Sequence, residues 1–366
     1  MPAARIYGVC MNKNVLIAMS GGVDSSVAAY LLKERGFVCT GAMMKLYAGD
    51  APVIHSGGCC SLEDAEDARA VAFRLDIPFY MFNFTGCFDK EVIGRFAGAY
   101  QNGATPNPCI DCNRYLKFDR FLKRAREIQI NHIATGHYAQ IEYDGASGRY
   151  LLKKAADPGK DQSYVLYSMT QEQLSMTLFP LGALHKSQVR EIALEQGFVN
   201  AKKRESQDIC FVPDGDYAAF IEKRTGASFK KGRFHDSRGN DLGEHKGIIH
   251  YTVGQRRGLG ISSPSPLYVC AIRPDTGVVV VGEERELYSK TLIAKDINLI
   301  PFDNIDAPMR VHAKIRYRQP EQPATVSQLD SGTLRVDFDS PQRAVTKGQA
   351  VVLYDGDVII GGGTIA

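Results

Sequence analysis

The sequence predicts an α/β fold, with a doubly wound parallel sheet in the first half of the chain and short β-strands in the second half. The first half alternates strand-like and helix-like patterns, beginning with an apolar run that leads through a glycine-rich turn into a helix. Beyond about Lys202, helical periodicity becomes scarce, and short β-rich runs separated by Gly, Pro and Asp replace it. A chain of 366 residues that changes character in this way is expected to form two or three domains.

The elements of the first half are placed by the spacing of their apolar residues. The run at 15–19 is typical of a buried parallel strand, and Val27, Ala28, Leu31 and Leu32 then fall on one helical face. Further strands are predicted at 38–44, 78–83 and 133–135, and further helices at 61–75, 88–100 and 114–128. In such a sheet ligands bind at the carboxyl ends of the strands, which is where the glycine-rich turn lies.

Regularly spaced short strands in the second half predict a small β-barrel or sandwich. The β-rich runs are 267–273, 277–281, 309–317, 324–329, 333–338 and 350–354. One helix is predicted before them, at 216–224. Residues 202–257 carry twelve Lys or Arg against eight Asp or Glu, which indicates either a solvated surface or a contact with RNA.

Composition narrows the classes of protein to which the chain can belong. No apolar run is long enough to span a bilayer, and the first residues lack a signal-peptide pattern, so a cytoplasmic location is expected. The nine cysteines are odd in number and irregularly spaced, which favours reduced thiols over a disulfide framework. The net charge of +3 does not by itself indicate a nucleic-acid-binding protein.

The glycine-rich turn, SGGVDSS at 20–26, has the composition of an anion-binding loop. A strand-to-helix turn directs backbone N–H groups at an anion, Gly21 and Gly22 allow the backbone to approach closely, and the serines add hydroxyl donors. The loop lacks the lysine of a Walker A motif and the spacing of a dinucleotide-binding fold. An ordinary glycine-rich turn is the alternative, but the loop resembles the SGGxDS motif of the PP-loop ATP pyrophosphatases, which cleave ATP between the α and β phosphates.

Two cysteine-containing stretches are the other candidate sites. In NPCIDCN (107–113), the prolines exclude helix before Cys109, and a basic helical pattern follows. Cys112 is therefore expected at or near a helix N-terminus beside cations, a setting that exposes a thiolate. Half of a zinc site, a structural cysteine and a thioredoxin-like dithiol are the alternatives. In SQDICFV (206–212), Cys210 lies among apolar residues, where packing is a more frequent role than chemistry.

Taken together, the motifs resemble those of the tRNA-specific 2-thiouridylases, a PP-loop family. They are SGGVDSS (20–26), NPCIDCN (107–113), TGHYA (135–139), KDQSYVL (160–166), ESQDICF (205–211), YTVGQRRGLG (251–260) and IRYRQ (315–319). They occur in the family's order and extend from residue 15 almost to the end of the chain. The resemblance implies a PP-loop ATPase domain at 1–205, a small central tRNA-contacting domain at 206–270 and a C-terminal β-barrel at 271–366.

The resemblance also implies roles for individual residues. Cys112 corresponds to the catalytic nucleophile, and Cys210 to the cysteine that carries a persulfide. Contacts to ATP are implied at Ala18, Met19, Ser20, Gly21, Gly22, Val23, Asp24, Ser25, Met44 and Gly136. The segment facing the target base is implied at Asn107, Pro108 and Cys109, contacts to tRNA at Lys160, Asp161, Gln162, Arg316 and Tyr317, and tRNA specificity at His137 and Gln349.

Three of these residues have alternative interpretations. A lone histidine in a strand-end loop, such as His137, is often a hydrogen-bonded structural residue. Tyr317 could stack on a nucleotide or be an ordinary barrel tyrosine. Some family members have Asp where this chain has Cys109, so the resulting C-x-x-C leaves open an iron–sulfur cluster held by Cys109, Cys112 and Cys210. The roles of Cys59 and Cys60 are left open.

The implied activity is ATP-dependent 2-thiolation of the wobble uridine of tRNA. The C2 oxygen is a poor leaving group until AMP is transferred to it, and the glycine loop with Mg²⁺ would stabilise the charge on the phosphates. The implied partners are a tRNA anticodon loop and a persulfide-bearing sulfur-donor or relay protein, with no membrane. Two rival functions are a PP-loop enzyme that adenylates a small-molecule carbonyl, and a non-catalytic RNA-binding or sulfur-carrier protein.

Overall fold

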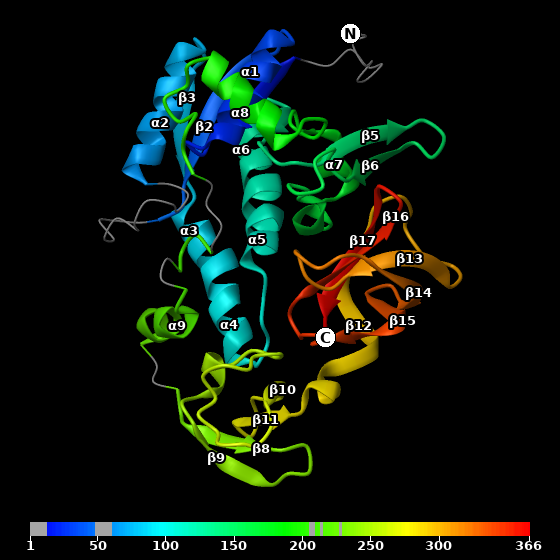
Figure 1. Ribbon diagram of the computed structural model, residues 1–366. Helices are drawn as coiled ribbons and strands as arrows, with labels where there is room; N and C mark the ends of the chain where they lie inside the picture. Colours follow the sequence, from blue (N-terminus) through cyan, green and yellow to red (C-terminus); the bar gives the residue numbers. More distant parts are fainter. Residues whose placement is uncertain (1–12, 48–60, 205–208, 213–214, 227–228) are drawn as a thin grey trace. The chain divides into compact units, whose positions relative to one another are not determined.

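The computed structural model describes residues 13–47, 61–204, 209–212, 215–226 and 229–366 (Figure 1). The chain divides into two compact units, which are described separately below. Unit 1 comprises Met1–Asp89, Asp111–Phe211 and Asp357–Ile359, and unit 2 comprises Lys90–Ile110, Val212–Gly356 and Ile360–Ala366. No helix among the described residues is both long enough and apolar enough to cross a membrane.

Unit 1 is built on a five-stranded parallel sheet with the strand order β3-β2-β1-β4-β7. The strands are β1 (Asn14–Ala18), β2 (Val38–Lys45), β3 (Phe79–Asn83), β4 (His132–Ala134) and β7 (Thr177–Leu178). Val15, Leu16 and Ile17 of the central strand are fully buried, as expected for a parallel strand covered on both faces. The predicted parallel-sheet α/β fold of the first half is confirmed.

Helices α1 (Val23–Glu34), α2 (Leu62–Arg74) and α8 (Lys186–Glu195) share one hydrophobic core with β1 and β2. The capping box of α2 forms as the sequence predicts: Ser61 Oγ accepts a hydrogen bond from Asp64 N at 3.0 Å, and Ser61 N donates to Asp64 Oδ2 at 2.9 Å. This cap places the start of α2 beside the glycine-rich loop, as described below.

The helix predicted at 114–128 begins six residues earlier than expected. Its helical segments are α5 (Pro108–Asp111), the π-helical segment η2 (Cys112–Arg120) and α6 (Phe121–Glu127). Proline has no backbone N–H and is well suited to the first position of a helix, so the Pro108 that excludes helix before it also starts the helix. The pattern at 88–100 forms as α3 (Thr85–Phe88), the π-helical segment η1 (Asp89–Gly94) and α4 (Arg95–Gln101).

The remaining elements of unit 1 lie between β4 and α8. They are the hairpin β5 (Gln140–Asp144) and β6 (Arg149–Lys153), the 3₁₀ turn η3 (Ser163–Leu166) and α7 (Gln171–Ser175). The loop between β4 and β5 carries the TGHYA motif, and the loop between β6 and η3 carries the KDQ motif.

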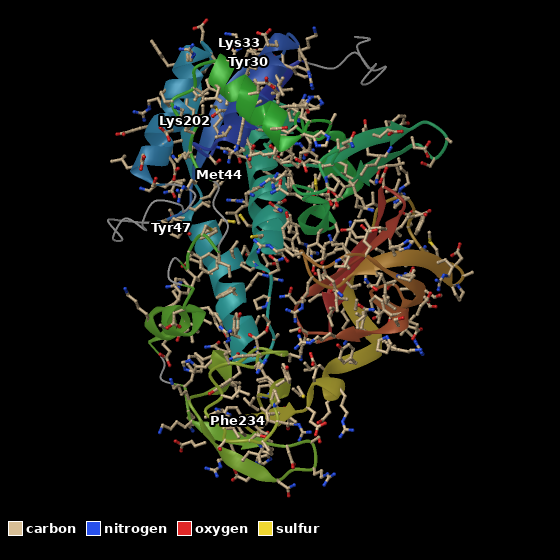
Figure 2. All side chains as sticks on the ribbon, in the orientation of Figure 1. Tyr30, Lys33, Met44, Tyr47, Lys202 and Phe234 are labelled. Atoms are coloured by element: carbon tan, nitrogen blue, oxygen red, sulfur yellow. The ribbon has the colours of Figure 1, made fainter. Side chains whose placement is uncertain are left out.

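Unit 2 contains a four-stranded sheet with the order β10-β11-β8-β9. Its strands are β8 (Gly232–His235), β9 (Asp241–His245), β10 (Tyr268–Arg273) and β11 (Val278–Gly282), with α9 (Tyr217–Thr225) and the 3₁₀ turn η4 (Ile248–His250) in the same unit. Its small core contains Phe234, Tyr251 and Val269; Phe234 is labelled in Figure 2. Helix α9 begins after the cap Asp216 and ends at Gly226, close to the predicted limits.

Six antiparallel strands close a β-barrel in unit 2, because β17 pairs back with the first strand, β12. The strands are β12 (Tyr288–Leu299), β13 (Met309–Lys314), β14 (Gln322–Asp330), β15 (Thr333–Arg343), β16 (Ala350–Asp355) and β17 (Val358–Ile365). Alternate residues of each strand fill the core, among them Leu334, Val336 and Phe338 of β15. The predicted C-terminal barrel is confirmed; the limits at 205 and 270 stay predictions.

Candidate active site: the glycine-rich loop and its surroundings

The glycine-rich loop joins β1 to α1 at the carboxyl edge of the sheet. Gly21 has φ +75°, and a Cβ there would lie 2.2 Å from the carbonyl oxygen of Asp64 at the start of α2. Only glycine fits so close to another backbone in this conformation. Gly22 is the N-cap of α1 and makes no side-chain capping hydrogen bond. The first N–H groups of α1 therefore lie at the helix end that favours an anion.

The serine hydroxyls, predicted as donors to an anion, bond largely within the loop. Ser25 Oγ and Ser26 Oγ each donate to the carbonyl oxygen of Gly22 at 3.0 Å, and Ser20 N donates to Ser25 Oγ at 3.1 Å. Asn200, which is 2% exposed, donates through Nδ2 to Gly21 O and to Ser26 Oγ, both at 2.9 Å. The loop is thus fixed in shape by its own hydroxyls and by one buried amide.

Asp24, in the first turn of α1, is held by two side chains that the sequence analysis did not select. Lys186 Nζ lies 2.7 and 2.8 Å from the two carboxylate oxygens, and Tyr138 OH donates to Oδ1 at 2.7 Å. Lys186 is 8% exposed and Tyr138 is 2% exposed. Gly136 packs against the same turn, since a Cβ there would lie 2.9 Å from Asp24 C and from Ser25 N. This close approach explains the glycine of the TGHYA motif.

The residues predicted to contact ATP follow the ends of three parallel strands. Ala18 ends β1, Met44 is the last residue but one of β2, and Gly136 follows β4 by two residues. Because the carboxyl ends of parallel strands lie at one edge of the sheet, these residues lie at the same edge as the glycine-rich loop. Figure 2 labels Met44 and also Tyr47, which follows β2. Contact of these residues with ATP stays a prediction.

Cys112 is the first residue of η2 and is partly buried. The next residue, Asn113, is 2% exposed and donates through Nδ2 to the carbonyl oxygen of Val165 at 3.0 Å, which anchors the start of η2 to η3. Arg114 and Lys117 lie on the same segment. The exposed thiolate expected at Cys112 stays a prediction. Cys112 follows the four residues of α5, within about one turn of the helix start.

Cys210 is also partly buried, and it contacts Tyr47, two residues after the end of β2. Tyr47 OH lies 3.5 Å from Cys210 Sγ. The ring of the neighbouring Phe211 packs edge-on against Phe88 of α3 with centroids 5.8 Å apart, and Phe88 packs against Tyr47 at 5.3 Å. The same α3 contacts η2, the segment that Cys112 begins. Phe211, the neighbour of Cys210, therefore packs on α3, and η2, which begins at Cys112, also contacts α3. Neither Cys112 nor Cys210 forms a disulfide. Residues 205–208 of the Cys210 motif lie outside the described residues.

His137 has the surroundings of a structural residue. It is 8% exposed and packs against Phe118 and Phe179, and Nδ1 lies 2.6 Å from Thr135 Oγ1. Nε2 lies 3.5 Å from Lys117 Nζ. Burial, and to a lesser extent the charge of Lys117, lowers the pKa of His137 well below its ordinary value, so the ring is neutral. A role in tRNA specificity stays a prediction.

The KDQ segment makes most of its side-chain contacts within unit 1. Asp161 accepts hydrogen bonds from Ala155 N at 3.0 Å and from Ser163 Oγ at 2.7 Å. Gln162 Oε1 accepts from Tyr138 N at 2.9 Å, and Gln162 N donates to Tyr138 O at 2.9 Å. Asp161 and Gln162 thus fix the loop that displays Lys160. Direct tRNA contact by the three residues stays a prediction.

The segment predicted to face the target base lies in unit 2, and Gln349 holds the residues before it. Gln349 Nε2 donates to the carbonyl oxygen of Thr105 at 2.7 Å, and Thr105 N donates to Lys347 O at 2.8 Å. Asn107 Oδ1 accepts from Cys109 N at 3.1 Å and so caps α5, whose first residue is Pro108. Cys109 itself is exposed.

Arg316 and Tyr317 lie in the turn after β13. Arg316 Nη2 donates to Ala344 O at 3.1 Å and to Thr346 Oγ1 at 2.9 Å, and Tyr317 is 37% exposed. Arg316 also lines a cavity of about 750 Å³ in unit 2, together with Arg257 and Arg343. A cavity lined by three guanidinium groups is suited to phosphate, which fits the predicted contact with RNA.

The proposed iron–sulfur cluster has no support in the described residues, which contain no group of three or more His, Cys, Asp or Glu placed to hold a metal ion. Cys109, Cys112 and Cys210 are all described, and none is bonded to another. Cys59 and Cys60 lie outside the described residues.

Sequence reasoning missed Lys186, Asn200 and the hydroxyl of Tyr138, although all three hold the glycine-rich loop. Lys186 is 162 residues from Asp24, and Asn200 is 179 residues from Gly21. No spacing rule links residues so far apart. The available signals were weak: Tyr138 lies inside the TGHYA motif, and Lys186 would occupy a helix N-terminus, where a cation is unfavourable without a partner.

Comparisons with known proteins cover almost the whole chain. Three family models match: a tRNA methyl transferase HUP domain at 13–214, a tRNA methyl transferase PRC-barrel domain at 218–283 and an aminomethyltransferase beta-barrel domain at 289–365. The tRNA-specific 2-thiouridylase MnmA of Clostridioides difficile (strain 630) is 52% identical over 355 residues, which are 97% of this chain and 98% of that protein.

Two further relatives carry the same name. That of Acetivibrio thermocellus is 52% identical, covering 96% of this chain and 99% of its own, and that of Clostridium acetobutylicum is 51% identical, covering 97% and 100%. Among solved structures, an NMN synthetase from Francisella tularensis matches 60% of this chain and 80% of its own with 16% identity and a TM-score of 0.35, which is too low to support an argument. The near-complete match at this identity shows that the chain belongs to the tRNA-specific 2-thiouridylase family.

Proposed function

We propose that the protein is a tRNA-uridine 2-sulfurtransferase that converts the wobble uridine of tRNA to 2-thiouridine and forms AMP and pyrophosphate from ATP. The observation that carries this proposal is the identity of about half of all residues with tRNA-specific 2-thiouridylases over nearly the full length. The local features that fit this activity are the glycine-rich loop at the sheet edge and the two cysteines of unit 1, which lie on segments that both contact α3.

The first step is adenylation of the uracil. The C2 carbonyl oxygen attacks the α-phosphorus of ATP, the bond to the β-phosphate bridging oxygen breaks, and pyrophosphate leaves. The N–H groups at the start of α1 bind the departing phosphates, because the helix end carries partial positive charge and its N-cap, Gly22, has no side chain to occupy them. The nucleotide contacts proposed for this step are Ala18, Met19, Ser20, Gly21, Gly22, Val23, Asp24, Ser25, Met44 and Gly136.

Mg²⁺, when bound with ATP, supplies positive charge to the phosphate oxygens. Magnesium needs only one or two protein carboxylates beside the substrate phosphates, so a site that lacks a cluster of ligands can still accept it. Asp24 is the carboxylate of the loop, and its pairing with Lys186 keeps it fixed at the start of α1.

The second step delivers sulfur to C2. In one route, the terminal sulfur of a Cys210 persulfide attacks C2 directly, and the Cys112 thiolate then attacks Cys210 Sγ, which breaks the S–S bond and leaves the terminal sulfur on C2. In the other route, Cys112 attacks the inner sulfur first and releases hydrosulfide, which then attacks C2. AMP leaves with the original C2 oxygen. In either route, Cys112 and Cys210 end as a disulfide, and an external dithiol must reduce it before the next turnover. A sulfur-donor or relay protein is proposed to load Cys210.

The target uridine must leave its stack to enter the site, which is least costly in a single-stranded anticodon loop. Asn107, Pro108 and Cys109 are proposed to face this base, and Lys160, Asp161, Gln162, Arg316 and Tyr317 to contact tRNA. Gln349 is proposed to influence tRNA specificity through Thr105, whose carbonyl oxygen accepts its hydrogen bond. His137 is proposed to influence tRNA specificity by packing inside the loop that carries it.

The test uses purified protein with ATP, a persulfide source, and an unmodified tRNA transcript that has uridine at the wobble position. Pyrophosphate release is followed together with 2-thiouridine, which is measured by mass spectrometry of the digested tRNA. We expect both products, and neither with a matched transcript that has cytidine at that position. Pyrophosphate release driven by a small carbonyl compound without tRNA, or RNA binding without any turnover, would overturn the proposal in favour of one of the two rival functions.

A further inference from the structure

Asp24 of the glycine-rich loop is clamped by two residues that come from different parts of unit 1. Tyr138 OH donates to Oδ1 at 2.7 Å from the loop after β4, and Lys186 Nζ reaches both oxygens from the first position of α8. The ammonium group of Lys186 also lies 5.8 Å from the centre of the Tyr138 ring. Both side chains are buried, so Asp24 has little freedom to move unless they move too.

The two clamping residues are themselves held by one short segment, Asp157–Gln162. At one end, Asp157 Oδ2 accepts a hydrogen bond from Lys186 N at 2.9 Å. At the other end, Gln162 exchanges two hydrogen bonds with the backbone of Tyr138, one through Oε1 and one through its own N–H, both at 2.9 Å. The segment therefore contacts both sides of the Asp24 clamp through direct, short hydrogen bonds.

The same segment displays the charge proposed to meet RNA. Lys160 lies between the two anchor points, and its backbone N–H donates to Asp157 O at 3.1 Å. The Nε2 group of Gln162 has no hydrogen-bond partner among the described residues, so a donor remains for a ligand. A phosphate or ribose that binds this segment would pull on the residues that fix Tyr138 and Lys186.

The charge of Asp24 explains why such a link matters. A carboxylate in the first turn of α1 lies where the phosphates of ATP must bind, and two anions a few ångströms apart repel strongly in a partly buried site. Lys186 neutralises the carboxylate, and Tyr138 fixes its direction. A small shift of either residue changes the electric field at the start of α1.

We propose that the Asp157–Gln162 segment couples tRNA binding to the ATP-binding loop, with Tyr138 and Lys186 as the positioning residues that carry the coupling to Asp24. The inference rests on the proposed function, because it requires that tRNA and ATP both bind unit 1. Linkage makes the coupling reciprocal: ATP raises the affinity for tRNA by the same factor as tRNA raises the affinity for ATP.

The test measures binding rather than turnover. The dissociation constant for unmodified tRNA is determined with and without α,β-methylene ATP, which cannot release pyrophosphate, for the full-length wild type and the variant Tyr138→Phe. We expect the analogue to tighten tRNA binding about tenfold in the wild type, which is within the usual range of coupling. In Tyr138→Phe, we expect the factor to fall below about two. The factor is a ratio of two dissociation constants of the same variant, so a change in the affinity for either ligand alone does not alter this expectation.

Tyr30→Phe is the matched control, because it removes a hydroxyl from α1 of the same unit while its ring keeps its edge-on contact with Phe198. It should keep the full coupling factor. Asp157→Ala tests the other arm of the segment and serves if Tyr138→Phe does not fold. Wild-type coupling in a folded Tyr138→Phe and in Asp157→Ala, or no coupling in the wild type, would overturn the inference. Loss of 2-thiouridine formation in the wild type would instead reject the proposed function.

Discussion

The two units bury different kinds of residue. Of the fourteen buried polar or charged residues among those described, eleven lie in unit 1, and several of them, including Ser26, Lys186 and Asn200, hold the glycine-rich loop. Unit 2 buries an apolar barrel core and keeps its ion pairs at the surface, such as Arg310–Asp339, whose side chains are 61% and 47% exposed.

This difference shows where each unit can do chemistry. Buried polar networks cost desolvation and fix positions sharply, so they are expected where reacting groups must be held. Surface charges contribute little to stability and remain available to a charged ligand such as RNA. Unit 1 therefore fits the reaction, together with the tRNA contacts proposed at Lys160, Asp161 and Gln162, and unit 2 fits the remaining part of recognition. Four experiments test this division, beginning with the one that should have the largest effect.

The largest difference is expected between the cysteines of the two units, in how much their replacement by serine lowers 2-thiouridine formation. Cys112→Ser and Cys210→Ser should each lower 2-thiouridine formation at least ~1000-fold, because serine can neither carry a persulfide nor form the disulfide that ends the reaction. ATP binding should persist in both variants. Cys270→Ser of unit 2 is the control: burial raises the pKa of Cys270 to about 11, so its thiol stays protonated and should be dispensable. Normal thiolation by either unit 1 variant would remove that cysteine from the mechanism.

The second largest difference is expected between two glycines of similar backbone conformation, in the stability that each loses when it is replaced by alanine. Gly21→Ala should lower the free energy of unfolding by roughly 3–5 kcal/mol, since it combines an unfavourable φ with a backbone clash. Its Cβ would lie 2.2 Å from Asp64 O at φ +75°. Gly277→Ala of unit 2 has φ +66° and open space around it, so it should cost only about 1–2 kcal/mol. If thermal denaturation showed that Gly21→Ala and Gly277→Ala lose equal stability, the glycine-rich loop would not be tightly packed.

His137 should make the stability of unit 1 depend on pH. Because burial lowers the pKa of His137 in the folded state, the unfolded chain binds its proton first as the pH falls. The contribution is fully present above about pH 6.5, the ordinary histidine value, and is lost as the pH falls from there toward the folded-state pKa. Each unit of pKa difference amounts to about 1.4 kcal/mol.

The measurement for His137 is the denaturation midpoint at pH 7.5 and at pH 5.5. The side chain of the variant His137→Gln does not bind a proton in this pH range. The variant should therefore lose less stability between pH 7.5 and pH 5.5 than the wild type does. His245 of unit 2 also has a pKa lowered by burial, so His245→Gln gives the matched comparison in the other unit. A wild-type midpoint that does not change with pH would contradict the lowered pKa of the two histidines.

The smallest effect is expected at Gln349 in unit 2. Gln349→Ala removes one hydrogen bond to Thr105 O, which is worth about 1 kcal/mol, and should weaken tRNA binding severalfold through the segment before Asn107. The dissociation constant for ATP should not change, because all the proposed ATP contacts lie in unit 1. A change in ATP affinity alone would show that the division between reaction and recognition is wrong.

The sequence by itself was sufficient to identify the elements that depend on neighbours along the chain. The buried run 15–19, the SGGVDSS loop after it and the Ser61–Asp64 capping box all formed where local pattern places them. The start of the basic helix was misplaced, because Pro108 both excludes helix before it and favours the first helical position. Local rules thus gave the element and its chemistry but not each boundary.

Only the tertiary structure decided which distant side chains hold the loop. Tyr138 lies 114 residues from Asp24, and Lys186 lies 162 residues from it, yet both bond its carboxylate. The physical reason is that periodicity reports which face of an element is apolar, not which other element covers that face. Buried polar pairs form where two such surfaces meet, so they are determined by the packing of the whole unit rather than by any stretch of sequence.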